Sequence, residues 1–386
     1  MATESLIGAD GLLAPHIHPM ADLLRRDVGG VLGGFLESQR RDFSQVLAEV
    51  AEPDSALGRL FADLEVLVPG QVAGLEATFL DLHDHVMNHP VWRHPFFVRV
   101  FEGRVTVEHI KSFALHYFNQ IKNTRQCVAL AIGRFHGLTS LAAGAKGERL
   151  SEITQIALAQ LVADEYGVGS HGLDDYPELG RLLASKTHMT MYRQLFEGLG
   201  IPADAQDVVL LPAVADNVLI QRLVAGHPAF SPLEALASVG LGMEWGVPEF
   251  FSLLLGGLIR VSERDGLGLT ARHLEVFIAH VRYDILHAIS VMLVTSLQMR
   301  GPGDLLQVKN ACNILMTGRY AMMSGLYAHI FAEPCAGPTE IGLEPRHQVG
   351  DRRIEMALID ARRQVAPRRV MGCEAYRSDT RTPFSM

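Results

Sequence analysis

Apolar residues recur at helical spacing along most of this chain, and alternating strand patterns of any length are hard to find. Gly and Pro residues separate the amphipathic stretches. The spacing predicts helices over residues 20–50, 55–68, 72–88, 106–127, 127–141, 148–166, 181–198, 204–225, 231–243, 247–261, 270–299 and 303–331. We therefore expect an all-α fold, and 386 residues with 48% hydrophobic content are enough for one large core.

Composition divides the chain into three parts. Residues 1–75 are expected to form an N-terminal helical extension, with dimer contacts as one use for it, although Gly29-Gly30 and Gly33-Gly34 argue against a single straight helix in its first half. Residues 76–332 hold most of the predicted helices and form the expected core. Residues 333–386 begin as a linker rich in proline and glycine, continue through a short predicted helix and end in a polar tail.

Charge and hydropathy exclude several classes of partner. A net charge of -9 leaves no concentrated basic surface of the kind that binds nucleic acid. The longest clean apolar run, Phe250–Ile259, is far shorter than the ~20 residues that a membrane span needs. No signal peptide is visible, and the four cysteines form no C-x-x-C pair, so we expect a cytoplasmic protein without a membrane or nucleic-acid partner.

The sharpest signal for chemistry is the segment His280-Val-Arg-Tyr-Asp284-Ile-Leu-His287. On a helix, positions i, i+4 and i+7 lie along one face, which puts two imidazoles and one carboxylate in a row. The segment is otherwise largely apolar, and each unpaired buried polar group costs roughly 1–3 kcal/mol. A pair of metal ions would satisfy all three side chains together, whereas an exposed helix face with three ordinary polar residues is the alternative.

Two further carboxylates stand at the ends of apolar helical stretches. Glu244 closes the stretch 235–243, where it is either a surface residue or an inward ligand. Glu165 lies in Asp164-Glu165-Tyr166-Gly167, four residues after Leu161, so it can face inward. Either His171 in the following loop or His188 at the start of the next helix can accompany Glu165. We favour His188, because a helix holds a ligand more rigidly than a Gly-rich loop does.

Together these residues form a donor set of three carboxylates and three histidines. Mixed nitrogen and oxygen ligands suit iron or manganese, and the absence of cysteine ligands argues against iron–sulfur clusters and structural zinc. Facing helices of a bundle commonly supply such sites. The set therefore predicts a dinuclear non-haem metal site. No flavin or NAD fingerprint appears in the chain, so an oxidative reaction here needs an external electron donor.

Residues 89–300 resemble the haem-oxygenase-like diiron oxidases and oxygenases. His94-Pro-Phe-Phe to Phe113-Ala-Leu-His-Tyr117 looks like the opening helix pair of that family, and Asp164-Glu165-Tyr-Gly looks like its first carboxylate motif. Glu244 falls where the second glutamate belongs, and the segment 277–288 is close to the most specific motif of the family. The chain departs from the pattern between Glu165 and the next histidine, where the match to His188 implies an inserted loop at about residues 169–186.

The resemblance implies a haem-oxygenase-like helical bundle with two iron ions that activate dioxygen. The ligands that it implies are Glu165, His188, Glu244, His280, Asp284 and His287. Family members oxygenate amines at nitrogen, decarboxylate acids oxidatively or cleave amino acids. Some amine N-oxygenases carry an N-terminal extension, often for dimer contacts, so we expect a homodimer that converts a small amine to a hydroxylamine, nitroso or nitro product in natural-product biosynthesis. Some of them add a further carboxylate ligand from an earlier core helix, but residues 109–147 contain no Asp or Glu.

The sequence leaves two rival hypotheses open. The first is oxidative C–C cleavage, decarboxylation or desaturation of an amino or fatty acid on the same diiron site; a substrate carboxylate would need a basic partner, for which Arg282 and Lys122 are candidates. The second is a protein of another class. It is either a cofactor-independent helical enzyme, which would not need all six ligands, or a non-catalytic binding protein, in which Glu165 and Asp284 could be changed without loss of function.

Overall fold

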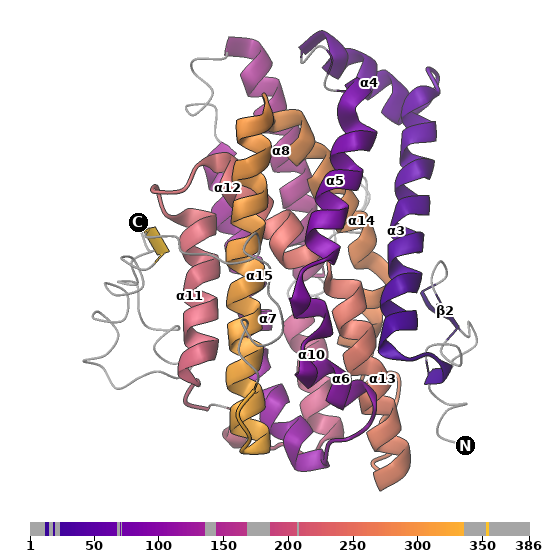
Figure 1. Cartoon of the computed structure of the whole chain (residues 1–386), viewed down its shortest axis with the longest axis vertical. Coiled ribbons are helices and arrows are strands. Elements are labelled where there is room, and N and C mark those ends of the chain that lie inside the picture. The colour runs from indigo at the N-terminus through magenta and orange to yellow at the C-terminus, as the bar shows by residue number, and fades with distance from the viewer. Residues whose placement is uncertain are drawn as a thin grey trace, which may run out of the picture.

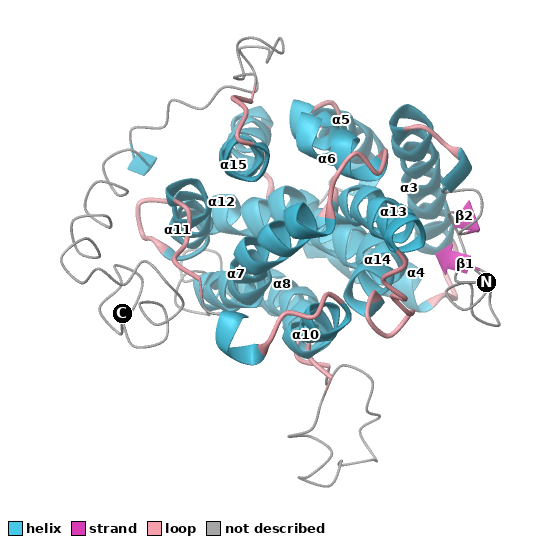
Figure 2. Ribbon diagram, turned by 90° about the horizontal axis from the view of Figure 1, so that it is seen from below, coloured by secondary structure: helices cyan, strands magenta, loops and turns pink. Residues whose placement is uncertain are grey.

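The computed structural model describes residues 12–14, 18–19, 24–67, 70, 72–135, 144–167, 186–206, 208–335 and 353–354, and these residues form an all-α protein. The predicted fold class is confirmed. Figure 1 shows the helices running roughly alongside one another in a bundle, and Figure 2 shows many of them end-on. One small antiparallel ladder, β1 (Leu12–Ala14) with β2 (His18–Pro19), precedes the first helix and was not predicted.

The predicted extension contains two long helices, α3 (Val28–Ala51) and α4 (Ala56–Leu67). Contrary to expectation, α3 continues without a break through both glycine pairs. Asp27 caps its first turn by accepting from the Gly30 backbone N–H at 2.7 Å, and Val31 and Leu32 are buried in the core. The cap and the burial together offset the low helix propensity of the glycines.

The bundle itself follows from residue 72 onward. Its helices are η1 (Val72–Gly74), α5 (Leu75–Met87), η2 (Pro90–Arg93), α6 (Pro95–Phe101), α7 (Val107–Ile132), η3 (Gly133–Phe135), α8 (Gly144–Glu165), α10 (His188–Gly198), η5 (Ala203–Gln206), α11 (Pro212–Gly226), α12 (Pro232–Ala237), η6 (Ser238–Glu244), α13 (Val247–Asp265), α14 (Glu275–Gln298) and α15 (Pro302–Phe331). The predicted break at residue 127 is wrong, because α7 runs on to Ile132. The helix predicted from residue 204 begins only at Pro212, which as N1 residue has no N–H to leave unpaired.

Helix α14 has several helical neighbours within the bundle. It packs against α8, α10, α13 and η6. Helix α8 runs antiparallel to it, since Asp164 on α8 contacts His287 at one end and Thr154 accepts from Gln298 at the other.

The helices of the predicted extension pack directly on the bundle. Gln39 on α3 is buried and donates from Nε2 to Glu249 Oε1 at 2.8 Å and to the Trp245 carbonyl at 3.2 Å. Arg260 on α13 donates to the carbonyl of Leu24 at 2.7 Å. The buried contacts of Gln39 fix α3 against Trp245 and the first turn of α13, so the extension and the core share one interior.

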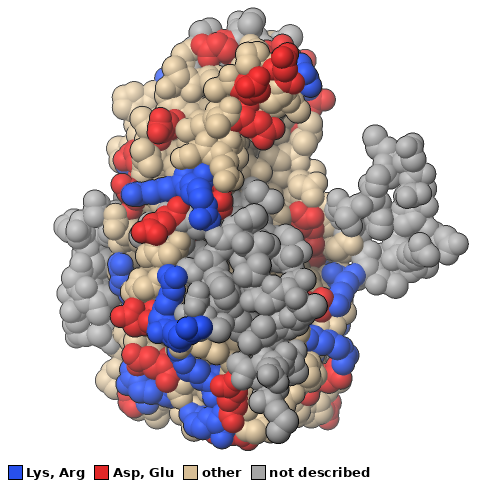
Figure 3. All heavy atoms as spheres, turned by 90° about the vertical axis from the view of Figure 1, so that its right-hand side faces the viewer, with Lys and Arg blue, Asp and Glu red and all other residues tan. Residues whose placement is uncertain are grey.

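Several predictions fall on residues that lie outside the described ranges. These are His171, the inserted loop between Gly167 and Lys186, and most of the segment 333–386, of which only 353–354 are described as helical. Within the described residues, none of the helices combines the length and the apolar composition that crossing a bilayer requires. On the face shown in Figure 3, basic and acidic side chains are interspersed over the described surface.

Candidate metal centre

The structure brings all six predicted ligand residues together inside the bundle. They form two groups, and within each group one donor atom per residue lies within 4.8 Å of the others. The first group is Glu165, His188 and His280, and the second is Glu244, Asp284 and His287. Each group therefore combines carboxylate oxygen and imidazole nitrogen, which is the donor set that iron and manganese accept.

Four elements supply these side chains, and α14 contributes to both groups. Glu165 ends α8, His188 begins α10, and Glu244 ends η6. His280, Asp284 and His287 follow one another along α14 at the helical spacing that the sequence predicted. The alternative of an exposed polar face is excluded, since Asp284 and His280 are buried and His287 is largely so.

Glu244 ends a π-helical segment that spans Ser238–Glu244. Such segments are rare and occur frequently at functional sites. Two glycines let this segment approach its neighbours closely: a Cβ on Gly240 would overlap Val291 of α14, and one on Gly242 would press on Leu315 of α15. The close packing brings Glu244 to the side of α14 that carries Asp284.

His280 is held in one tautomer. Its Nδ1 lies 2.6 Å from the carbonyl oxygen of Val276, and because a carbonyl only accepts, Nδ1 must donate. Nε2 is left with its lone pair, as a metal ligand requires. The His280 ring stacks on Phe251 with ring centroids 4.4 Å apart, and the centroid of the His188 ring also lies 4.4 Å from that of His280. In the same group, His188 Nδ1 lies 2.9 Å from Glu165 Oε1.

His287 lies between two aspartates. Its Nε2 is 2.6 Å from Asp164 Oδ2, and its Nδ1 is 3.6 Å from Asp284 Oδ1. Burial by itself would lower the pKa of His287, but the hydrogen bonds to Asp164 and Asp284 outweigh it and raise the pKa to about 11. The same histidine helps to lower the pKa of Asp164, against the opposing effect of burial. Asp164 therefore fixes the orientation of the His287 ring.

The carboxylates of the site repel one another. Burial raises the pKa of Glu244 to about 8, and the charges of Asp284 and Glu165 add to this effect. For Glu165, burial works in the same direction, but the adjacent His188 outweighs it and lowers the pKa. Burial likewise lowers the pKa of the His280 imidazole. Burial and the acidic neighbours thus favour the neutral form of Glu244, whereas His188 favours the charged form of Glu165.

The residues present fit a pair of metal ions. Oδ2 of Asp284 is buried and has no hydrogen-bond partner in the described part of the chain, although an oxygen in that position costs roughly 1–3 kcal/mol. The neighbours of this oxygen are the other members of the two groups, so a cation shared with them is the partner that suits it. Cations bound at both groups would neutralise the three carboxylates and use this orphaned oxygen.

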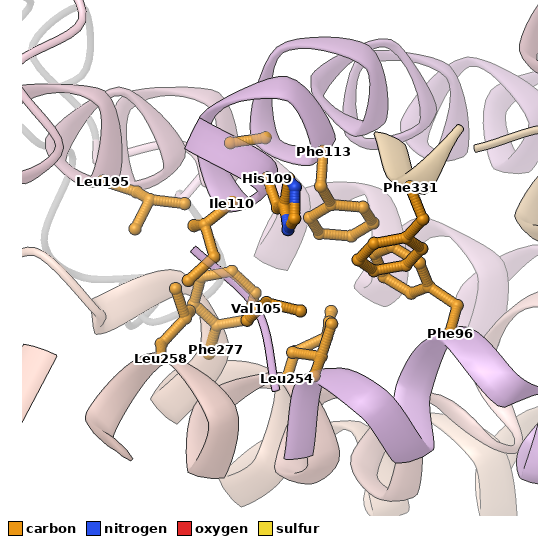
Figure 4. A pocket seen from close by; sticks show the side chains of 12 residues that line it. Phe96, Val105, His109, Ile110, Phe113, Leu195, Leu254, Leu258, Phe277 and Phe331 are labelled. Carbon is orange, nitrogen blue, oxygen red and sulfur yellow. The ribbon is translucent and has the colours of Figure 1, made fainter. Parts of the chain in front are cut away.

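A cavity of about 900 Å³ opens beside the two groups. Asp164, His188, Asp284 and His287 form part of its lining, and most of the remaining lining is apolar. Its volume is within the range of small-molecule sites. A second hollow, shown in Figure 4, is lined by His109 and otherwise by apolar side chains, among them Phe96, Phe113 and Phe277. It holds only about 10 Å³ and none of the six residues, so it has room for roughly one water molecule and no substrate.

Sequence reasoning missed Asp164. The dipeptide Asp164-Glu165 was part of the predicted carboxylate motif, yet only Glu165 was given a role there. The available signal was the acidic residue next to Glu165. In the last turn of a helix, two adjacent side chains can both reach the same site. Between His188 and His171, the structure brings His188 to the site, and His171 lies outside the described residues.

No protein-family model matches this chain, and no curated protein matches it in sequence. Among solved structures, the chain is similar to a TenA homologue from Pseudomonas syringae pv. tomato, with 9% sequence identity and a TM-score of 0.47. The match covers 67% of this chain and 93% of that one.

Proposed function

We propose that this protein is a non-haem diiron oxygenase that uses dioxygen to oxidise a small molecule. The observation that carries the proposal is the pair of adjoining buried groups, each with carboxylate and imidazole donors, around the orphaned Oδ2 of Asp284. Glu165, His188 and His280 would hold one ion, and Glu244, Asp284 and His287 the other. The chemistry that two ferrous ions supply when bound is the activation of dioxygen, with electrons from an external donor.

The protein's own residues contribute orientation and the exclusion of water. The carbonyl of Val276 accepts a hydrogen bond from Nδ1 of His280, and the carboxylate of Asp164 accepts one from Nε2 of His287. Both contacts fix the orientation of an imidazole ring. Phe251 covers one face of the His280 ring. On the side away from the cavity, packed side chains of η6 and α13 exclude water, because both elements are almost entirely buried. A dry, rigid donor set strengthens electrostatic interactions with whatever binds there.

An amine is the substrate class that we favour. Among the described side chains that line the cavity, Asp164, Glu275 and Asp284 are acidic, Lys186 is the one lysine or arginine, and His287 is paired with Asp164. Lys186 is already paired with Glu275 at 2.5 Å, so it is a poor partner for a substrate carboxylate. Lys122 does not line the cavity, and its ammonium lies 4.3 Å from the centre of the Phe118 ring. No lysine or arginine of the described lining is thus placed to bind a substrate carboxylate, which favours an amine over a fatty or amino acid, and N-oxygenation over decarboxylation.

The test is an anaerobic titration of the metal-free protein with Fe(II), followed by rapid mixing with oxygen-saturated buffer. We expect two iron ions per chain and a transient visible absorption that depends on oxygen and that amine substrates quench. His188→Ala and Asp284→Ala should each lower the iron stoichiometry. Asp63→Asn, at an exposed position of α4, is the matched control and should leave it unchanged. Binding of one iron or none, without an oxygen-dependent transient, would contradict the diiron proposal and favour a cofactor-independent protein.

A further inference from the structure

Helix α4 of the N-terminal extension forms one wall of the cavity that opens beside the candidate metal centre. Leu57, Leu60, Phe61 and Leu64 all line it. Their spacing of three and four residues places them on one face of the helix. Arg59, Ala62 and Asp63, which lie between them, are exposed. The apolar face of α4 is thus turned toward the cavity.

The wall opposite α4 is apolar as well. Helix α8 presents Ile153, Ile156 and Ala157, and α14 presents Leu293, Val294 and Leu297. Ile156 is 60% exposed although it is a large apolar side chain, which indicates that the cavity is open near this residue. Three helices therefore surround this part of the cavity with hydrocarbon groups.

The polar and the apolar linings occupy different ends of the cavity. Along α14 the lining changes from Asp284 and His287 to Leu293 and Leu297, and ten residues of helix from His287 to Leu297 span roughly 15 Å. The antiparallel α8 repeats this order, from Asp164 beside His287 to Thr154 beside Gln298. Figure 1 shows α4 near the upper end of the bundle and α10, which supplies His188, in its lower half.

We propose that α4 sets the length and the hydrophobic character of the substrate: the cavity takes an elongated amine whose hydrocarbon part packs against Leu57, Leu60, Phe61 and Leu64 while its amino group lies near Asp164 and the metal centre. This inference rests on the proposed function for the reacting end only. It gives the extension a role in substrate selection that is separate from dimer contacts.

The experiment measures binding to the metal-free protein, so that it does not depend on iron or on turnover. Hexylamine, octylamine, decylamine and dodecylamine are titrated below the concentrations at which they aggregate, by isothermal titration calorimetry. We expect affinity to rise with chain length by up to about fourfold per methylene group, the factor that corresponds to burial of one CH₂ at roughly 0.8 kcal/mol.

Three variants locate the hydrocarbon part. Leu60→Trp fills the cavity and should abolish the gain from octylamine to dodecylamine while leaving hexylamine unchanged. Leu60→Ala, which adds no volume, should weaken dodecylamine several-fold and serves if the larger side chain prevents folding. Ala62→Trp puts the same indole on the exposed side of α4 and should change nothing.

Three results would overturn the inference. The first is an affinity that does not depend on chain length in the unmodified protein. The second is an equal response of alkylamine binding to Leu60→Trp and Ala62→Trp. The third is a change of oligomeric state on Leu60→Trp without a change in chain-length dependence. That result would make this face of α4 a contact between copies of the chain. Iron stoichiometry, measured on the same variants, should stay unchanged, so a failure here is distinguishable from a failure of the diiron proposal.

Discussion

Asp164 and His287 are 123 residues apart in sequence, yet Oδ2 of the carboxylate and Nε2 of the imidazole lie 2.6 Å apart. The contact ties the end of α8 to the middle of α14. It leaves Nδ1 of His287 on the side of Asp284, 3.6 Å from its Oδ1. A carboxylate that holds the far nitrogen of a ligating histidine is a common device of metal sites, because it fixes the tautomer and the ring orientation.

Replacing Asp164 by asparagine should weaken iron binding without unfolding the protein. The amide keeps the shape of the side chain but loses the charge that stabilises the His287 proton, and loss of such a partner costs roughly 10–100-fold in metal affinity. An anaerobic Fe(II) titration of Asp164→Asn measures this change. Asp63→Asn is the control, and an unaltered affinity in both variants would contradict the role given to Asp164.

Replacing Glu244 by glutamine should have opposite effects on the metal-free and the iron-loaded protein. Without metal, Glu244 is held at a pKa of about 8 by burial and by its acidic neighbours, so the neutral amide should raise the free energy of unfolding by about 1–3 kcal/mol near neutral pH. With iron in ~100-fold excess over its Kd, the unmodified protein should gain about 2.7 kcal/mol and the variant clearly less. Urea denaturation with and without Fe(II) measures both quantities. A metal-free variant that is less stable than the unmodified protein would speak against carboxylate crowding at this site.

Replacing Gly240 by alanine should disturb the π-helical segment that carries Glu244. The added methyl group would overlap Val291, and overpacking of this kind costs typically 1–3 kcal/mol. We expect iron affinity to fall together with stability, and Val291→Ala to restore part of both in the double variant. Gly303→Ala is the control, since its Cβ would meet nothing within 4 Å. Additive effects of Gly240→Ala and Val291→Ala would show that this contact does not position Glu244.

Glu249 makes the protein less stable as the pH rises. Burial raises its pKa to about 8 from an ordinary value of 4.5. Between these two values the unfolded chain releases a proton that the folded protein keeps, so the free energy of unfolding falls with rising pH and levels off above about 8. Glu249→Gln removes this contribution while its side-chain oxygen still accepts from Gln39. The difference in stability between variant and parent should therefore grow from pH ~4.5 to ~8, by about 1.4 kcal/mol for each unit of the pKa shift. A difference that is independent of pH would show that Glu249 is ionised in the folded state.

The six candidate ligands could be named from the sequence because each lies at or near a helix end or in a row along one helix. The row His280, Asp284 and His287 follows directly from helical geometry. His188 was found through its position at the start of a helix, whereas the partner of His287 was not found. Spacing places residues within one helix but says nothing about which residue of a distant helix faces them, so Asp164 could be seen only once α8 and α14 were packed.

The sequence by itself determined the helical class of the protein, most of the helix positions and the chemical types of the donors, because these depend on local periodicity and composition. Tertiary structure decided the continuity of α3 through its glycines, the π-helical turn at Glu244 and the use of α4 as a cavity wall. Each of these depends on close packing between segments distant in the chain: the burial of Val31, the fit of Gly240 on Val291, and the apolar face that Leu57 and Leu60 turn toward α8 and α14. Local propensities are worth less than about 1 kcal/mol per residue, and such packing outweighs them.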